Sequence, residues 1–258
     1  MDDPKQPTMT YAAIMNIRID YSEINLNKVD KKIEALTRVL ALAAPKIAEM
    51  GGMMTKASEE GIEAVFENDA ERPLKASFAF FSSAGECLDP EELSRLYVGI
   101  HWGEVYLAKL SYGSFTTPFA ISEDVVVARR LSASACNYDS RIMMSGSAVQ
   151  RIHSFENRFN CRRLGLIRNG RTGRDESIYD VFDSDPTNLK YGKRRSRLVF
   201  ETGVRLFLKG EYLQARAYFI EILKYTRNDK TAKKYIFMCD KALAETDTGA
   251  SHKYLEVW

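Results

Sequence analysis

Apolar and polar positions recur along the first third of the chain with two different periods. Thr10–Ile19 is a run of apolar and β-branched residues that is typical of a buried strand. In Asn27–Met50 the apolar residues return every three or four positions, which predicts an amphipathic helix, and the glycine pair after it is where such a helix would end. Met53–Lys56 and Gly61–Glu67 then predict a β-hairpin around a polar turn.

The middle of the chain continues this mixture of elements. Pro73–Ala84 has few charges and many small and aromatic residues, as expected of a helix that packs closely on a sheet. Leu96–Leu131 predicts a strand, a turn at the Gly-x-x-x-Gly sequence between Gly99 and Gly103, a second strand, a polar arm and a helix that begins near Ser122.

Short elements complete this part of the chain. Arg141–Met144 predicts a strand, Ser145–Ile152 a short helix, and Arg162–Ile167 with Ser177–Phe182 a closing hairpin. Strands and helices do not alternate strictly, so the pattern indicates an α+β fold with a mixed sheet.

Helical spacing dominates the C-terminal part. Lys190–Arg197 (KYGKRRSR) is a basic stretch that we expect to be a solvated linker, with contact to phosphate or acidic lipid as the alternative. From Leu198 two helices around the turn Lys209–Glu211 resemble a tetratricopeptide pair, and Thr231–Glu245 predicts a third helix. Because one repeat cannot form a solenoid, this tail is expected to pack on the preceding domain, on a second copy or on a partner protein.

Composition narrows the class of protein. The chain has 258 residues, of which 45% are hydrophobic and 28% charged, which suits one globular domain with a small appendage. A formal net charge of +2 gives no reason to expect nucleic acid or an anionic membrane as a partner. The four cysteines are scattered, so neither a zinc site nor a disulfide framework is predicted, and a reducing cytoplasm is the expected setting. No apolar run approaches the ~18 residues of a membrane span.

Motifs in a fixed order give the chain a family resemblance. GIHWGEV at Gly99–Val105 precedes VVVARRL at Val125–Leu131, GGMMTKASEEGIEAVF occupies Gly51–Phe66, and RRLGLIRNGR occupies Arg162–Arg171. Together they resemble the catalytic domain of class III nucleotidyl (adenylate and guanylate) cyclases over roughly residues 10–183. The resemblance implies a ferredoxin-like β-α-β-β-α-β core with a mixed sheet, which acts as a dimer with two sites at the subunit boundary.

The predicted division of the chain follows from these features. We expect a flexible lead-in (1–9), a nucleotidyl cyclase-like domain (10–185), a basic linker (186–197), a tetratricopeptide-like helical tail (198–246) and a C-terminal extension (247–258). Similar tails follow cyclase domains in some bacterial proteins, which favours a bacterial signalling protein.

The resemblance also implies a metal site, which this sequence matches poorly. Two carboxylates hold two Mg²⁺ or Mn²⁺ ions in an active cyclase. Their positions are Asn16, which carries no negative charge, and Glu60, which is one methylene longer than aspartate. Asp20 is the nearest substitute for the first, whereas Glu59 and Glu60 are expected to be exposed turn carboxylates if no metal binds.

The remaining site positions follow in the same way. The helix after Ser122 should supply an asparagine that orients the ribose and an arginine that stabilises the reacting phosphate; these positions hold Val126 and Arg130. Lys56 matches a purine-selecting lysine, and Phe119 stands where an aspartate is expected. The late loop keeps a basic character through Arg168 and Arg171. Each basic residue has an ordinary alternative role as a solvated charge, and we expect His101 to be a hydrogen-bonded core imidazole.

Two hypotheses about function therefore remain. The first is a catalytically degenerate cyclase-homology domain, a homodimer without a required cofactor, that serves as a scaffold, regulator or nucleotide sensor. The alternative is an active cyclase that converts a nucleoside triphosphate to a 3′,5′-cyclic nucleotide with Mg²⁺ or Mn²⁺. Because each lost charge-stabilising donor typically costs ~3 kcal/mol of barrier lowering, the substitutions favour the first.

Overall fold

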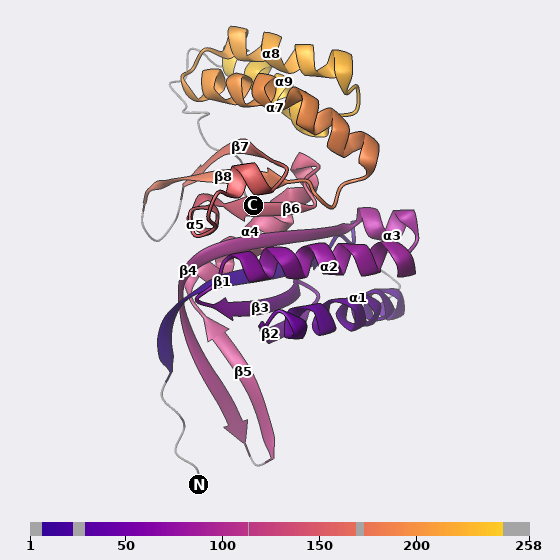
Figure 1. Cartoon of the computed structure of the whole chain (residues 1–258), viewed down its shortest axis with the longest axis vertical. Coiled ribbons are helices and arrows are strands. Elements are labelled where there is room, and N and C mark those ends of the chain that lie inside the picture. Colours follow the sequence, from indigo (N-terminus) through magenta and orange to yellow (C-terminus); the bar gives the residue numbers. More distant parts are fainter. Residues whose placement is uncertain (1–6, 23–28, 113, 169–172, 245–258) are drawn as a thin grey trace.

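A mixed β-sheet forms the centre of the protein (Figure 1). The computed structural model describes residues 7–22, 29–112, 114–168 and 173–244. The strand order is β2-β3-β1-β4-β6-β8-β7, with β5 paired to the outer part of β4, and β4 with β6 is the parallel pair. The strands are β1 Thr8–Ile19, β2 Met53–Ser58, β3 Gly61–Glu67, β4 Leu96–Tyr112, β5 Phe115–Ile121, β6 Ile142–Ser145, β7 Cys161–Arg168 and β8 Asp175–Val181.

Helices cover both faces of the sheet. Because successive strand residues point to opposite faces, β1 places Ala13 and Met15 against α1 and α2, and Ala12 and Ile14 against α4. The predicted buried strand and the α+β fold are therefore confirmed. The helices are α1 Val29–Glu49, α2 Glu71–Cys87, α3 Pro90–Ser94, α4 Glu123–Ala135, η1 Cys136–Tyr138, α5 Gly146–Val149, α6 Phe155–Arg158, α7 Thr187–Leu208, α8 Tyr212–Tyr225 and α9 Lys230–Ala244.

The termini of the described chain adjust two predicted boundaries. Strand β1 begins at Thr8, so the last residues of the predicted lead-in belong to the sheet. The predicted C-terminal extension lies outside the described residues. Among the residues that the structure describes, none of the helices combines the length and the apolar composition that crossing a bilayer requires.

Strand β4 corrects one prediction. It runs without interruption from Leu96 to Tyr112, so the predicted turn between Gly99 and Gly103 is wrong. The two glycines instead lie where α4 crosses the strand. A Cβ atom on Gly99 would lie 2.2 Å from the carbonyl oxygen of Ala128, and one on Gly103 would lie 2.3 Å from the carboxyl group of Asp124. The glycines are therefore required by close helix-to-sheet packing and not by a turn.

A pair of glycine substitutions tests this close approach. Gly99→Ala is expected to lower the free energy of unfolding by about 1–3 kcal/mol, because the added methyl group meets the backbone of α4. Gly85→Ala is the control: Gly85 is exposed on the outer side of helix α2 and its Cβ would meet nothing nearer than 4.0 Å, so a gain of about 0.5–1 kcal/mol is expected. Urea unfolding measures both, and equal effects of the two substitutions would contradict the packing explanation.

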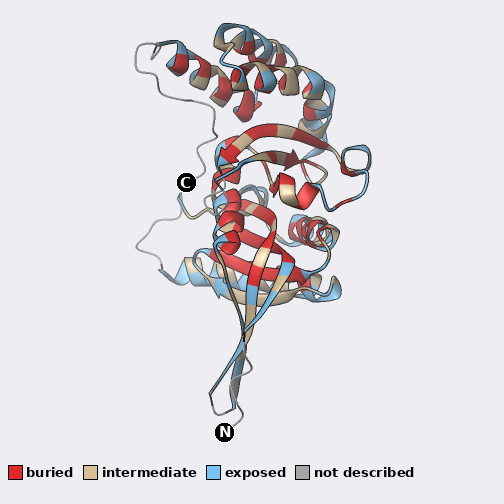
Figure 2. Cartoon of the chain, turned by 90° about the vertical axis from the view of Figure 1, so that its left-hand side faces the viewer, coloured by how far each residue is buried: buried red, intermediate tan, exposed pale blue. Residues whose placement is uncertain are grey.

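The C-terminal helices pack on the sheet of the same chain. Figure 2 shows buried residues on the inner faces of α7–α9 and on the strands beneath them. One apolar cluster joins Leu131 of α4 and Leu164 of β7 to Phe200 of α7, Phe219 of α8 and Tyr235 of α9. Of the three packing arrangements expected for the tail, the structure shows contact with the preceding domain.

The predicted solvated linker is wrong. Residues 187–197 form the first half of α7, and Lys193 within them is fully buried. Its ammonium group lies 2.7 Å from Asp185 and 3.0 Å from Asp180, and donates to the backbone carbonyl of Asp139 at 2.8 Å. Although burial alone would lower the pKa of Lys193, these carboxylates raise it above its ordinary value. A basic stretch thus contains a charge that the fold requires.

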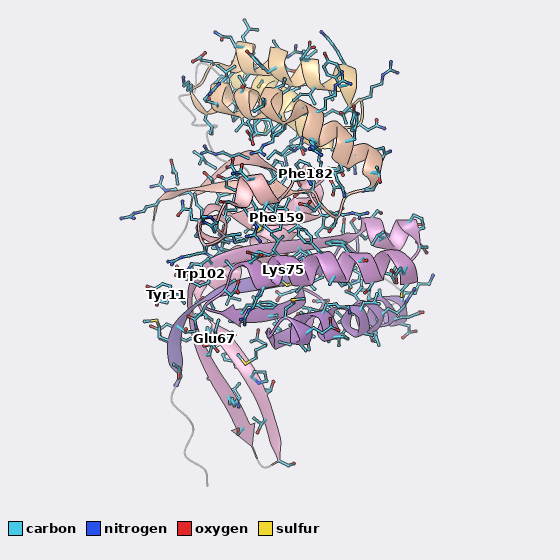
Figure 3. The ribbon with its side chains drawn as sticks, viewed as in Figure 1. Tyr11, Glu67, Lys75, Trp102, Phe159 and Phe182 are labelled. Carbon is cyan, nitrogen blue, oxygen red and sulfur yellow. The ribbon has the colours of Figure 1, made fainter. Side chains whose placement is uncertain are left out.

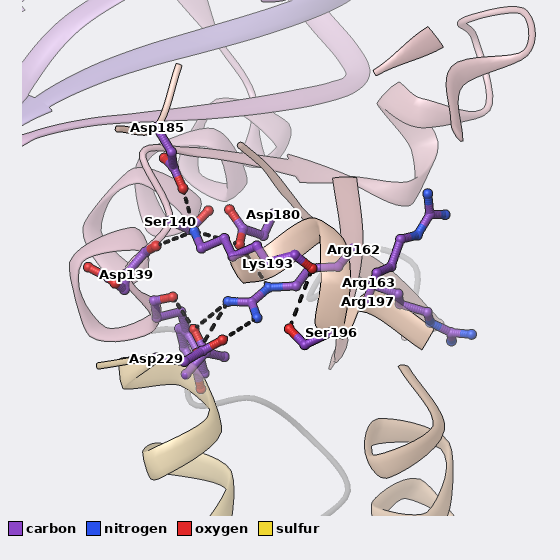
Figure 4. A network of polar contacts seen from close by, with 12 residues as sticks. Asp139, Ser140, Arg162, Arg163, Asp180, Asp185, Lys193, Ser196, Arg197 and Asp229 are labelled. Atoms are coloured by element: carbon purple, nitrogen blue, oxygen red, sulfur yellow. Dashed lines mark hydrogen bonds and ion pairs between the residues drawn. The ribbon is translucent and has the colours of Figure 1, made fainter. Parts of the chain in front are cut away.

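A second buried cation extends this network to α9 (Figure 4). Arg162 on β7 donates to Asp180 at 3.0 Å and to Asp229 at 2.6 Å, and its guanidinium lies 4.2 Å from the ring centroid of Phe200. Burial raises the pKa of Asp185 to about 6 even though Lys193 opposes the change. Because the partners come from β7, β8, α7 and the start of α9, the network fixes the tail to the sheet.

Candidate functional site on the α4 face

The candidate site is built where β1 and β3 lie side by side beneath α4. Asn16 is directly opposite Glu63 in the antiparallel register. Both side chains are on the face that α4 covers, because Asn16 follows Ala12 and Ile14 at intervals of two. The side chains are almost fully buried, with residue exposures of 1% for Asn16 and 3% for Glu63.

Helix α4 supplies a partner to each of these side chains. It begins, as predicted, after Ser122, whose hydroxyl accepts a hydrogen bond from the N–H of Val125. Ser132 donates to Asn16 Oδ1 at 2.5 Å, and Arg129 lies 3.0 Å from Glu63 Oε1. Residues three apart lie on one side of a helix, so α4 places Arg129 and Ser132 over neighbouring strands.

Glu60 lies on the exposed turn between β2 and β3, as expected for a turn carboxylate. Its carboxylate lies 2.5 Å from Lys56 Nζ and 3.8 Å from Arg129 Nη1. The hydrogen bond from Lys56 is the main reason that the pKa of Glu60 falls below its ordinary value. Lys56 and Glu60, two positions that sequence reasoning assigned to purine and metal, are therefore in contact with each other.

These residues do not fit a pair of divalent ions. Asn16 offers a neutral oxygen that already accepts from Ser132, and its Nδ2 is buried and has no hydrogen-bond partner in the described part of the chain. Both glutamates lie against cationic side chains. Within the described ranges no group of three or more His, Cys, Asp or Glu side chains is arranged to hold a metal ion. Hard cations need several oxygen ligands with negative charge, which this arrangement does not supply.

Asp20, the expected substitute for the first carboxylate, lies elsewhere. It follows β1, and its carboxylate accepts from the N–H of Ser22 at 2.9 Å. It lines a cavity of about 450 Å³ together with Asp139 and Asp185, and Glu60 is not among the lining residues. A substitute for the first carboxylate would have to lie beside Glu60, which holds the second position. Asp20 lines a cavity that Glu60 does not line, so the structure does not support this substitution.

The other predicted site positions lie on outward surfaces. Val126 and Arg130 are exposed and one helical turn apart on α4, facing away from the sheet. Phe119 is exposed on β5, which packs beside β2. Arg168 is exposed at the end of β7, and Arg171 lies outside the described residues. Asn16, in contrast, is covered by α4.

His101 is a hydrogen-bonded core imidazole, as predicted. It is 1% exposed, with Nδ1 2.8 Å from the hydroxyl of Ser145 and Nε2 3.3 Å from the carboxylate of Asp124. These contacts connect β4 to the starts of α4 and α5. The sequence did not point to Glu63 or Arg129, although Arg129 follows Val125 by four positions and thus shares its inward-facing side of the helix.

Comparison with known proteins identifies the fold. No protein-family model matches the chain. The chain is 26% identical over 222 residues to the terminal-differentiation-specific adenylate cyclase of Dictyostelium discoideum, an alignment that covers 82% of this chain and 10% of that protein. The chain thus spans about a tenth of the length of this curated relative.

Solved structures of cyclases share the arrangement. A bacterial light-regulated adenylyl cyclase aligns with a TM-score of 0.59 and 15% identity, covering 74% of this chain and 58% of that one. The adenylyl cyclase CyaB from P. aeruginosa gives 0.52 and 18%, covering 69% and 96%. The non-canonical dimeric guanylyl cyclase domain of the RhoGC fusion protein from the aquatic fungus Blastocladiella emersonii gives 0.54 and 13%, covering 68% and 98%. The chain therefore has the fold of nucleotidyl cyclase domains. Its sequence is related to that of an adenylate cyclase at 26% identity.

Proposed function

We propose that this chain is a non-catalytic, self-associating module with the nucleotidyl cyclase fold, which acts as a regulator or scaffold in signalling. The observation that carries the proposal is the exposure of Phe119 and Val126, each 39% exposed. The resemblance places polar, nucleotide-contacting side chains at both positions. Apolar groups there offer a nucleotide no hydrogen bond, but they suit contact with protein.

Phe119 belongs to an apolar surface on the projecting strands, here called the arm surface, whereas Val126 lies on α4, which packs against the other face of these strands. Met9 is opposite Tyr106, which is opposite Ile121, and Ala108 is opposite Phe119. Side chains two positions apart share a face, so the exposed apolar residues of the three strands lie on one side. The arm surface consists of Met9, Tyr11, Tyr106, Leu110, Phe119 and Ile121.

A second copy of the chain is the occupant that we propose for the arm surface. Figure 1 shows β4 and β5 extending away from the rest of the domain, and Figure 3 places Tyr11 near the base of this extension. An apolar surface of this kind on a projecting hairpin is typical of an interface between subunits. The fungal domain with the same fold forms a non-canonical dimer, which supports self-association of this fold.

The loss of catalytic groups supports the non-catalytic part of the proposal. The carboxamide of Asn16 and the isopropyl group of Val126 replace two polar groups that the resemblance assigns to metal binding and to ribose orientation. At ~3 kcal/mol each, two such losses correspond to roughly four orders of magnitude in rate. Arg130 alone does not compensate for them.

An assay with purified protein tests the proposal. Incubation with Mn²⁺ and ATP or GTP is expected to give no cyclic nucleotide above background, while sedimentation equilibrium shows a reversible dimer. Turnover that disappears in Glu60→Ala would overturn the proposal, and so would a strictly monomeric protein. Calorimetry with each nucleotide then separates a nucleotide sensor from a scaffold.

An active cyclase is the second candidate function. The observation that favours it is the sequence relationship to an adenylate cyclase across most of this chain. In that case Mg²⁺ or Mn²⁺ would be required, and Arg130 on the exposed side of α4 would contact the reacting phosphate. The same assay decides between the two candidates.

A further inference from the structure

Two carboxylates of the candidate site share one guanidinium group. The side chain of Glu63 is 5% exposed, and its Oε1 lies 3.0 Å from Arg129 Nη2. The Nη1 atom of the same arginine lies 3.8 Å from Glu60 Oε2. A carboxylate as buried as that of Glu63 is stable in its charged form only next to a cation. Arg129 is the cation that pairs with Glu63, while Lys56, which is opposite Glu63 in the β2–β3 register, lies 2.5 Å from Glu60.

The geometry points to a specific replacement, which rests on the proposed non-catalytic function. We propose that Arg129 is a permanent cation of this site and that its guanidinium occupies the place of the divalent ions that the family resemblance implies near Asn16 and Glu60. The carboxylates of Glu60 and Glu63 would then serve structure: they hold the β2–β3 hairpin against α4 without metal.

Arginine is suited to this role for two reasons. Its guanidinium stays protonated at every physiological pH and presents separate N–H groups to two carboxylates. It is also part of the chain itself, so the cation is present in every folded molecule whether or not metal ions are available. A divalent ion would have to displace it or bind beside a positive charge, and the only oxygen that Asn16 offers is already bonded to Ser132.

Removal of the guanidinium should therefore create a response to metal. In Arg129→Ala the thermal midpoint in metal-free buffer is expected to fall by about 5–10 °C, because Glu63 stays buried but loses the guanidinium that lies 3.0 Å from it. Millimolar Mg²⁺ or Mn²⁺ should recover at least half of this loss. The wild-type midpoint should not change with either ion. Arg130→Ala is the matched control, since Arg130 is the exposed neighbour on the same helix and should produce neither effect.

Two further variants keep the test decisive. If Arg129→Ala does not fold, Arg129→Gln removes the charge but keeps a donor for Glu63, and the same metal response is expected. Adding Glu63→Gln to either variant should abolish that response. Electron paramagnetic resonance of Mn²⁺ then counts bound ions, with none expected in the wild type and one in Arg129→Ala.

Two results would overturn this inference. In the first, Mn²⁺ raises the thermal midpoint of the wild type as much as it raises that of Arg129→Ala. In the second, Arg129→Ala folds but its thermal midpoint does not change with either ion. None of these readouts uses cyclase activity. Cyclic nucleotide formation by the wild type would therefore refute the proposed function separately, whereas a missing metal response would refute only the role of Arg129.

Discussion

Replacing Arg162 by methionine is expected to lower the free energy of unfolding by about 3–5 kcal/mol. The side chain is fully buried and pairs with Asp180 and Asp229, both of which are also buried. Methionine fills a similar volume but leaves Asp229 without its cation. The cost therefore comes from the uncompensated carboxylate and not from a cavity.

Arg163→Met is the matched control for this experiment. Arg163 is the next residue on β7 and alternates to the other side of the strand, and in Figure 4 its side chain points away from the network. Urea unfolding should show less than about 1 kcal/mol of change for this variant. A loss below 1 kcal/mol in Arg162→Met would contradict the importance of the network. The double variant Arg162→Met/Asp229→Leu should recover much of the loss, because no buried charge then lacks a partner.

The network also determines how the tail is attached. Asp229 precedes α9, and its carboxylate accepts from the N–H of Ala232 as well as from Arg162. Thr231, two residues further along in the first turn of α9, donates its hydroxyl hydrogen to the backbone carbonyl of Tyr138 in η1. Loss of Arg162 should thus loosen α9 first. We therefore expect the sheet and the helical tail to unfold together, since Arg162 and Lys193 connect them through buried ion pairs.

Most elements of the fold could be predicted because their signals are local. The apolar run of β1, the helical period of α1 and the glycine pair after it each depend on neighbouring residues, and the structure confirms them. The uninterrupted β4 was not predicted, since Gly99 and Gly103 are explained only by α4 crossing above them. The start of α7 was missed for a similar reason: a basic stretch is expected to be solvated until its acidic partners are known.

The candidate site was predictable by position and not by contact. Motif spacing indicated Asn16, Glu60, Val126 and Arg130 through a family resemblance, and the structure shows where each lies. Motif spacing could not indicate that Glu63 and Arg129 would pair, because this contact joins β3 to α4 across more than sixty positions of sequence. Such long-range ion pairs leave no periodic signal in the chain.

Ile121→Asp is expected to weaken self-association by at least about 30-fold, equivalent to ~2 kcal/mol or more. Ile121 is 59% exposed and lies opposite Tyr106 near the middle of the arm surface. If a second copy covers this surface, the substitution places a carboxylate in an apolar contact where it has no partner. Ile121 contributes little to the core of the monomer. The thermal midpoint of the Ile121→Asp protein should therefore differ from that of the wild type by less than about 2 °C.

Leu198→Asp provides the control for this prediction. Leu198 is 77% exposed on α7, at the opposite end of the molecule from the arm, so the change adds the same charge outside the proposed interface. Sedimentation equilibrium over a range of protein concentrations should give the wild-type dissociation constant for Leu198→Asp and a mostly monomeric protein for Ile121→Asp. Equal weakening by both variants would indicate a general effect of charge. A dimer unaffected by Ile121→Asp would show that a second copy does not cover the arm surface, and the exposure of Phe119 would then need a different explanation.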